Sequence, residues 1–113
     1  MKEKFKINDI VRIKKKKHGL DLFYSFGQRH YRRFHIGETG KIFHIEKDVA
    51  SDASNRYLPV RFDIIKIWVY HKDGNPSICR CMEDELEKAD KIESEKYEEA
   101  DEKYNARIIA EKL

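Results

Sequence analysis

The segment from Lys14 to His35 carries the side chains best suited to binding an anion. It holds four consecutive lysines and three arginines, interspersed with aromatic residues, and a single acid, Asp21. Lysine and arginine neutralise phosphates, and aromatic rings or guanidinium planes stack on unpaired bases. The residues predicted to contact nucleic acid or another anionic partner are Lys14, Lys15, Lys16, Lys17, Arg29, Tyr31, Arg32 and Arg33. In the alternative interpretation the aromatic residues belong to the core and the charged residues form a solvated rim. Phe23 and Phe26 fit this core role better than a contact role.

A second candidate surface centres on tryptophan and tyrosine, which are common in protein-binding hot spots. In the run from Ile64 to His71, strand alternation puts Ile65, Ile67 and Val69 on one face and Trp68 and Tyr70 on the other. Because both faces carry apolar residues, one of them can meet a partner or the C-terminal helix. The predicted protein-contact residues are Trp68, Tyr70, Tyr97 and Tyr104.

Metal binding and catalysis find little support in the spacing of histidine, cysteine and serine. Zinc needs four converging ligands, and the one-residue gap between Cys79 and Cys81 is too short for a zinc knuckle. Neither Ser25 nor Ser77 lies in a Gly-x-Ser-x-Gly context. His71 and Cys79 could meet across the last predicted hairpin, but nothing indicates an activated thiol. No glycine-rich phosphate cradle is present, so we predict a non-enzymatic protein with no metal and no cofactor.

Length and composition predict one small domain in the cytoplasm. The 113 residues are 40% charged and 40% hydrophobic, with room for one modest core. No apolar run approaches the length of a membrane span, and residues 1–6 lack the apolar core of a signal peptide. Cys79 and Cys81 would share one face of a strand, too close in sequence for an ordinary disulfide, so we expect free thiols in a reducing compartment.

The hydrophobic pattern is mainly that of β-strands. A first strand is predicted from Ile10 to Lys15 after a turn at Asn8-Asp9, and a second over 41–46 after a glycine-bounded turn at 36–40. A polar loop at 47–55 precedes alternation over 56–63, where Pro59 indicates an edge, and a β-prone run over 64–71. Asp73-Gly74 marks a hairpin before the last strand, 77–82.

From Glu83 onward the pattern is helical and acidic. No glycine or proline occurs after Pro76, which favours a helix from about Glu83 to Lys112, interrupted near 93–95. Residues 1–82 have 18 Lys+Arg against 9 Asp+Glu, whereas residues 83–113 have 6 against 12. This asymmetry predicts two surfaces with different partners, or one that masks the other. The apolar stripe begins with Leu86, Ala89 and Ile92, through which the helix packs on the strands unless it protrudes.

Four short segments occur in a suggestive order: 8–13 (NDIVRI), 37–42 (GETGKI), 58–63 (LPVRFD) and 84–87 (DELE). Together they resemble small SH3-like barrel domains of bacterial and phage proteins, and the resemblance covers about residues 5–88. The stretch 8–45 is also similar to KOW-type barrels of ribosomal proteins and transcription elongation factors, where a Gly-x-x-Gly-Lys turn follows a strand. The resemblance implies that residues 1–82 form an SH3-like barrel of about five strands, with an extended basic-aromatic first loop and an acidic helix at 83–113.

Two functions from different classes follow from these features. The preferred hypothesis is a small non-enzymatic binding protein whose basic-aromatic loop engages nucleic acid or a nucleoprotein complex. The alternative is a protein-interaction module that uses Trp68, Tyr70 and the acidic helix, such as a phage-encoded inhibitor of a host enzyme or defence complex. No membrane partner is expected under either hypothesis.

Overall fold

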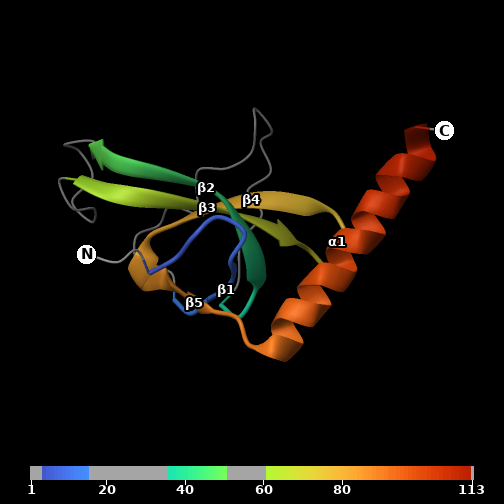
Figure 1. The fold of residues 1–113 in the computed structure, drawn as a ribbon, viewed down its shortest axis with the longest axis horizontal. Coiled ribbons are helices and arrows are strands. Elements are labelled where there is room, and N and C mark those ends of the chain that lie inside the picture. The colour runs from blue at the N-terminus through green and yellow to red at the C-terminus, as the bar shows by residue number, and fades with distance from the viewer. Residues whose placement is uncertain (1–3, 16–35, 51–60, 113) are drawn as a thin grey trace.

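One antiparallel sheet and one helix make up the fold in a computed structural model, which describes residues 4–15, 36–50 and 61–112. The sheet has five strands in the order β4-β3-β2-β1-β5 (Figure 1). The elements are β1 (Ile10–Ile13), β2 (Thr39–Ala50), β3 (Arg61–Tyr70), β4 (Pro76–Cys81), the 3-10 turn η2 (Glu83–Glu85), β5 (Leu86–Lys88) and α1 (Lys91–Lys112). The prediction of a mainly-β chain with a C-terminal helix is confirmed. The sheet is open, with β4 and β5 as its edges, so the described residues do not form a closed barrel.

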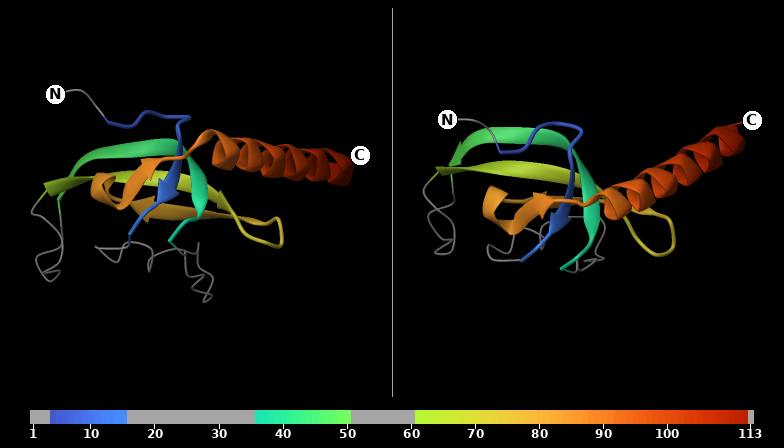
Figure 2. Two further views of the ribbon diagram at one scale, coloured as in Figure 1. Left: turned by 90° about the horizontal axis from the view of Figure 1, so that it is seen from below. Right: turned by 60° about the horizontal axis from the view of Figure 1, so that its bottom comes forward.

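The core is shared by the two ends of this sheet. Val11 and Ile13 of β1 and Leu86 of β5 pack in one buried cluster with Ile67 and Cys79 of β3 and β4. These strands are not all ladder neighbours, so the sheet must curl to bring them together. Figure 2 shows β1 crossing the long strands at a steep angle. Curling lets a short chain enclose an aliphatic core that a flat sheet would leave half exposed.

Alternation along β3 follows the predicted pattern. Ile65, Ile67 and Val69 are buried in the main core, and Trp68 lies on the opposite face with Tyr70. Ile64, on that opposite face, is buried in a separate small cluster with Phe62. Because side chains alternate with a period of two, the register of β3 decides which residues face the helix.

The predicted turns form, with one difference at the paired glycines. Asn8 has a φ of 79° and Gly74 a φ of 83°, the left-handed conformation that turns of this kind require. Gly37, with a φ of 96°, makes the turn before β2. Gly40 is instead inside β2, where an added Cβ would lie 2.9 Å from Val69 Cγ2 and 3.0 Å from the Trp68 carbonyl oxygen. Gly40 is therefore needed for close packing rather than for the turn.

Strand lengths differ from the predicted ones around residue 50. β2 continues to Ala50 through register shifts at 42/44 and 46/49, so residues 47–50 are not the predicted loop. The shifts explain the missing periodicity, because each irregularity changes which residues face the core. β3 is one strand where two patterns, 56–63 and 64–71, were predicted. Residues 51–60, with the edge predicted at Pro59, lie outside the described residues.

The predicted start of the helix at Glu83 is wrong. Residues 83–85 form a 3-10 turn, and Leu86–Lys88 form a strand in which Leu86 pairs with Ile13. Leu86 is fully buried, so burial in the core overrides the helical propensity of its neighbours. The predicted packing through Ile92 is also wrong, since this side chain is 65% exposed.

The helix begins where the sequence supplies a cap. Asp90 Oδ1 accepts a hydrogen bond from the Glu93 amide at 2.8 Å, and Glu93 Oε1 accepts one from the Asp90 amide at 3.1 Å. This reciprocal capping box satisfies two backbone donors at the helix start. From there α1 runs through Lys112 without the interruption predicted near 93–95, and its C-terminal end extends past the sheet (Figure 1).

Candidate functional site

The four predicted protein-contact residues meet where α1 crosses β3. The ring centroids of Tyr70 and Tyr97 are 5.4 Å apart, those of Tyr70 and Tyr104 5.6 Å, and those of Trp68 and Tyr104 6.4 Å. Trp68 and Tyr70 come from the outer face of β3, and Tyr97 and Tyr104 lie seven residues apart on one helix face. The sequence left open whether this face of β3 meets a partner or the C-terminal helix, and in the structure the helix packs on it.

Two of these aromatic residues hold the helix on the sheet. Tyr97 is only 4% exposed, and its hydroxyl donates a hydrogen bond to the Trp68 carbonyl oxygen at 2.8 Å. Tyr70 donates a hydrogen bond to the Asp101 carboxylate. Burial raises the pKa of Tyr97, while burial and the bond to Asp101 raise the pKa of Tyr70 to about 12. Both phenols therefore stay protonated and keep donating across the physiological pH range.

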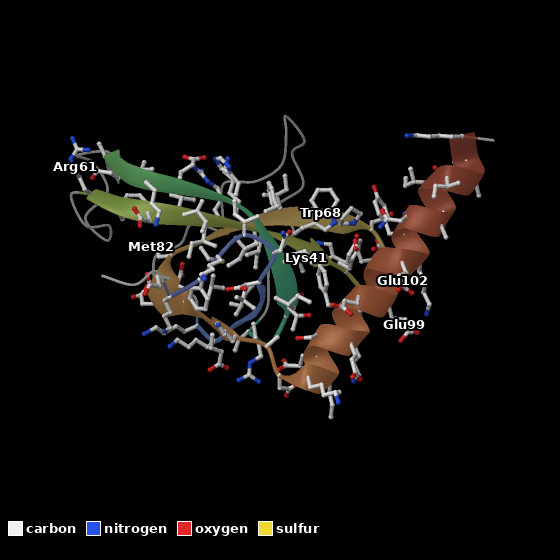
Figure 3. All side chains as sticks on the ribbon, viewed as in Figure 1. Lys41, Arg61, Trp68, Met82, Glu99 and Glu102 are labelled. Carbon is white, nitrogen blue, oxygen red and sulfur yellow. The ribbon has the colours of Figure 1, made fainter. Side chains whose placement is uncertain are left out.

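The accessible part of this region is a shallow hollow of about 340 Å³ that we call the aromatic groove. Phe43 is 39% exposed at its rim and meets Trp68 edge to face, with 6.2 Å between ring centroids. Lys41 Nζ lies 5.9 Å from the centroid of the Tyr97 ring. Figure 3 shows Lys41 and Trp68 on the part of the sheet that α1 crosses. The lining residues are Lys41, Phe43, Trp68, Tyr70, Tyr97, Asp101, Tyr104 and Asn105.

Sequence analysis did not single out Phe43 or Lys41. Phe43 follows Ile42, which is fully buried, so simple alternation already places it on the outer face of β2. The register of β2 against β3 pairs Lys41 with Trp68 directly. That pairing was the missing information, because neighbouring residues across a sheet cannot be read from one strand alone.

The basic segment is anchored at both ends by backbone hydrogen bonds. The Gly37 amide donates to the Ile13 carbonyl oxygen at 2.7 Å, and the Ile13 amide donates to that of Glu38 at 2.9 Å. Lys14 and Lys15 follow β1 with exposed side chains, and the Lys14 amide donates to the Glu85 carbonyl oxygen at 2.9 Å. The segment thus leaves and rejoins the sheet at one place. The other predicted contact residues, Lys16, Lys17, Arg29, Tyr31, Arg32 and Arg33, lie outside the described residues.

Both cysteines are buried in the core, and His71 is hydrogen-bonded in the β3–β4 hairpin. Cys79 and Cys81 lie fully buried on one strand face, as predicted, and their Sγ atoms are 3.5 Å apart. His71 Nε2 lies 2.8 Å from Ser77 Oγ across the β3–β4 hairpin, while Cys79 is inside the core. Among the described residues no group of three or more His, Cys, Asp or Glu side chains could hold a metal ion.

Comparison with known proteins gives no further guide to the site. No protein-family model, curated protein or solved structure matches this chain. In residues 4–15, 36–50 and 61–112 no helix is both long and apolar enough to cross a membrane. The class of partner therefore has to come from the chemistry of the chain's own surfaces.

Proposed function

We propose that this chain is a small non-enzymatic binding protein whose segment 14–35 engages an anionic partner, a nucleic acid or a nucleoprotein complex. The observation that carries the proposal is the anchoring of this cationic segment. Its seven lysines and arginines stand against one acid, and both of its ends are held by backbone bonds between Ile13 and residues 37–38. A stretch with this excess of positive charge attracts anions over a range of several ångströms, which favours contact with a phosphate backbone.

The proposed architecture is an SH3-like barrel. Two features support it: the strand order β4-β3-β2-β1-β5 and the 3-10 turn that leads into β5. The shared core of β1, β5, β3 and β4 is also what a curled, barrel-like sheet requires. In such a fold, long connections between strands are suitable places for binding residues because the sheet fixes their ends.

The binding test is the salt dependence of affinity for a single-stranded oligonucleotide. Affinity should fall steeply with salt, and the double variant Arg32→Ala/Arg33→Ala should reduce the slope of log K against log salt by about 0.7 for each phosphate that is no longer neutralised. The matched control is Arg61→Ala/Lys112→Ala, which removes the same charge from exposed positions outside the segment. Absence of binding at low salt, or equal slopes for the two variants, would overturn the proposal.

A second function, a protein-interaction module, is favoured by the exposure of Phe43. A half-exposed aromatic residue beside Trp68 and Tyr104 forms the kind of rigid, amphipathic surface that protein partners bury. This is the setting in which the chain could act as an inhibitor of another protein. Affinity capture with wild type and with Phe43→Ser tests it. A partner retained equally by both proteins would exclude the aromatic groove as the contact.

A further inference from the structure

A second hollow adjoins the aromatic groove and lies between α1 and the β3–β4 turn. Its volume is about 450 Å³, and Tyr104 lines both this hollow and the aromatic groove. We call it the cationic pocket. The turn contributes His71, Lys72 and Gly74, and the helix contributes Lys96, Glu99, Ala100, Lys103, Tyr104 and Arg107.

The helical spacing of its cations places them on one face. Lys96, Lys103 and Arg107 are separated by seven and four residues, which are same-face intervals of an α-helix. Of the five cations of α1 these three line the pocket, whereas only Glu99 of its seven acids does. The face of the acidic helix that lines the pocket is therefore mainly positive.

Contacts across the pocket fix the turn relative to the helix. The Arg107 guanidinium donates a hydrogen bond to Asn75 Oδ1 at 2.9 Å and lies 5.4 Å from the centroid of the Tyr104 ring. The turn itself is closed by the His71 amide, which donates to the Asn75 carbonyl oxygen at 3.0 Å. The only acid of the turn, Asp73, accepts a hydrogen bond from the Asn75 amide at 2.9 Å. The walls are therefore preformed, which lowers the entropic cost of binding.

Positive charge is in excess among the residues that line the cationic pocket. Glu99 pairs with Lys103 at 3.2 Å, and it is the only acid among the lining residues. Lys72 and Lys96 form no ion pair within the described residues and have exposed side chains. Four cations against one carboxylate leave a charge that attracts an anion, and the guanidinium and ammonium groups suit phosphate oxygens in particular. The hollow has the size of a small-ligand site.

We propose that the cationic pocket binds phosphate groups, supplied either by a free oligophosphate or by a nucleic-acid backbone. Lys72 from the turn and Lys96 from the helix provide the ionic contacts, and Arg107, further along the same helix face, provides a positioned hydrogen-bond donor. The site is separate from segment 14–35 and does not depend on what that segment binds.

Amide chemical-shift titration of the whole chain tests the site with tripolyphosphate and, separately, with a single-stranded oligonucleotide, both at constant ionic strength. Shifts should concentrate at residues 71–75 and 96–107. Shifts with tripolyphosphate, with or without the oligonucleotide, identify a free phosphate ligand, and shifts with the oligonucleotide alone identify a backbone phosphate. The double variant Lys72→Ala/Lys96→Ala should bind about tenfold more weakly, as removal of a charged hydrogen bond implies.

Lys91→Ala/Lys112→Ala is the matched control, because it removes two exposed lysines of the same helix that do not line the pocket. It should bind like wild type. Equal weakening by the two double variants, or no shift with either ligand, would overturn the proposal. Titration of Arg32→Ala/Arg33→Ala keeps the two sites distinguishable, since shifts at 71–75 should persist there even if segment 14–35 binds nothing.

Discussion

The two sides of α1 are built from different chemistry, although the same helix supplies both. Toward the sheet, Tyr97 is buried and its hydroxyl bonds to the Trp68 carbonyl oxygen. Toward the β3–β4 turn, Lys96 and Lys103 are exposed, and the only helix side chain hydrogen-bonded to the turn among the described residues is that of Arg107. Tyr104 lies between them and lines both hollows.

The sheet side of α1 therefore holds the helix on the sheet, whereas the turn side is available to bind a ligand. Burying an aromatic side chain removes a large apolar area from water, whereas exposed cations in a solvated hollow contribute little to folding. Changes to the aromatic side chains on the sheet side should therefore alter stability, and removal of the exposed lysines on the turn side should alter ligand affinity with little effect on stability. Substitutions on each side measure how complete that separation is.

Replacing Tyr97 should have the largest effect on stability. Tyr97→Ala removes a buried ring and its hydrogen bond, and we expect a decrease of about 3 kcal/mol in the free energy of unfolding. Urea unfolding followed by circular dichroism measures it. Tyr97→Phe keeps the ring and should lower the free energy of unfolding by about 1 kcal/mol through the missing hydrogen bond. A decrease under about 1 kcal/mol for the alanine variant would show that the helix is not held by this contact.

Two glycine substitutions compare the sheet beneath Trp68 with the β3–β4 turn. Gly40→Ala places a Cβ 3.0 Å from the Trp68 carbonyl oxygen, a backbone atom that has little room to move, and should cost about 1–3 kcal/mol. Gly74→Ala meets no atom within 4 Å but sits at a φ of 83°, so it should cost about 1 kcal/mol. Chemical denaturation ranks them. Gly40→Ala should also perturb Trp68 fluorescence, which Gly74→Ala should leave unchanged.

Local sequence patterns predicted β1, β4 and the hairpin turn at Gly74, because each depends on nearby residues. They also predicted the two faces of β3, where isoleucines and valine alternate with Trp68 and Tyr70. The prediction that the helix starts at Glu83 was wrong for a physical reason. Leu86 is required by the core, and one buried leucine fixes three residues as a strand despite acids that favour a helix.

The candidate surfaces were predictable only as sets of residues. Tyr97 and Tyr104 were found from their type and their spacing on the helix, and Trp68 and Tyr70 from strand alternation. That the two pairs pack together depends on where α1 crosses the sheet, which no local pattern contains. The cationic pocket was missed because the distance along the chain between Lys72 and Lys96 hides their proximity.

Alkaline pH should weaken the contacts that Tyr70 and Tyr97 make between α1 and the sheet. The pKa of Tyr70 is raised to about 12 in the folded chain, and that of Tyr97 is raised as well, against an ordinary value of 10.0. Their contribution to stability is complete below pH 10 and is lost as the pH rises toward 12, because the unfolded chain releases these protons first. Unfolding free energies measured from about pH 9 to about pH 12 should fall, and they should fall less steeply for Tyr70→Phe. Parallel curves for the two proteins would contradict the assignment.

The smallest expected effect is on the turn side, where Lys72→Ala/Lys96→Ala should change the free energy of unfolding by no more than about 0.5 kcal/mol. Both side chains are exposed and have no ion pair among the described residues, so their removal breaks no such contact. In thermal unfolding, tripolyphosphate should then raise the midpoint of wild type more than that of the variant, because stabilisation by a ligand of the folded state grows with its affinity. A variant destabilised by more than about 1 kcal/mol without ligand would mean that these lysines support the docked helix. The two sides of α1 would then share one structural task.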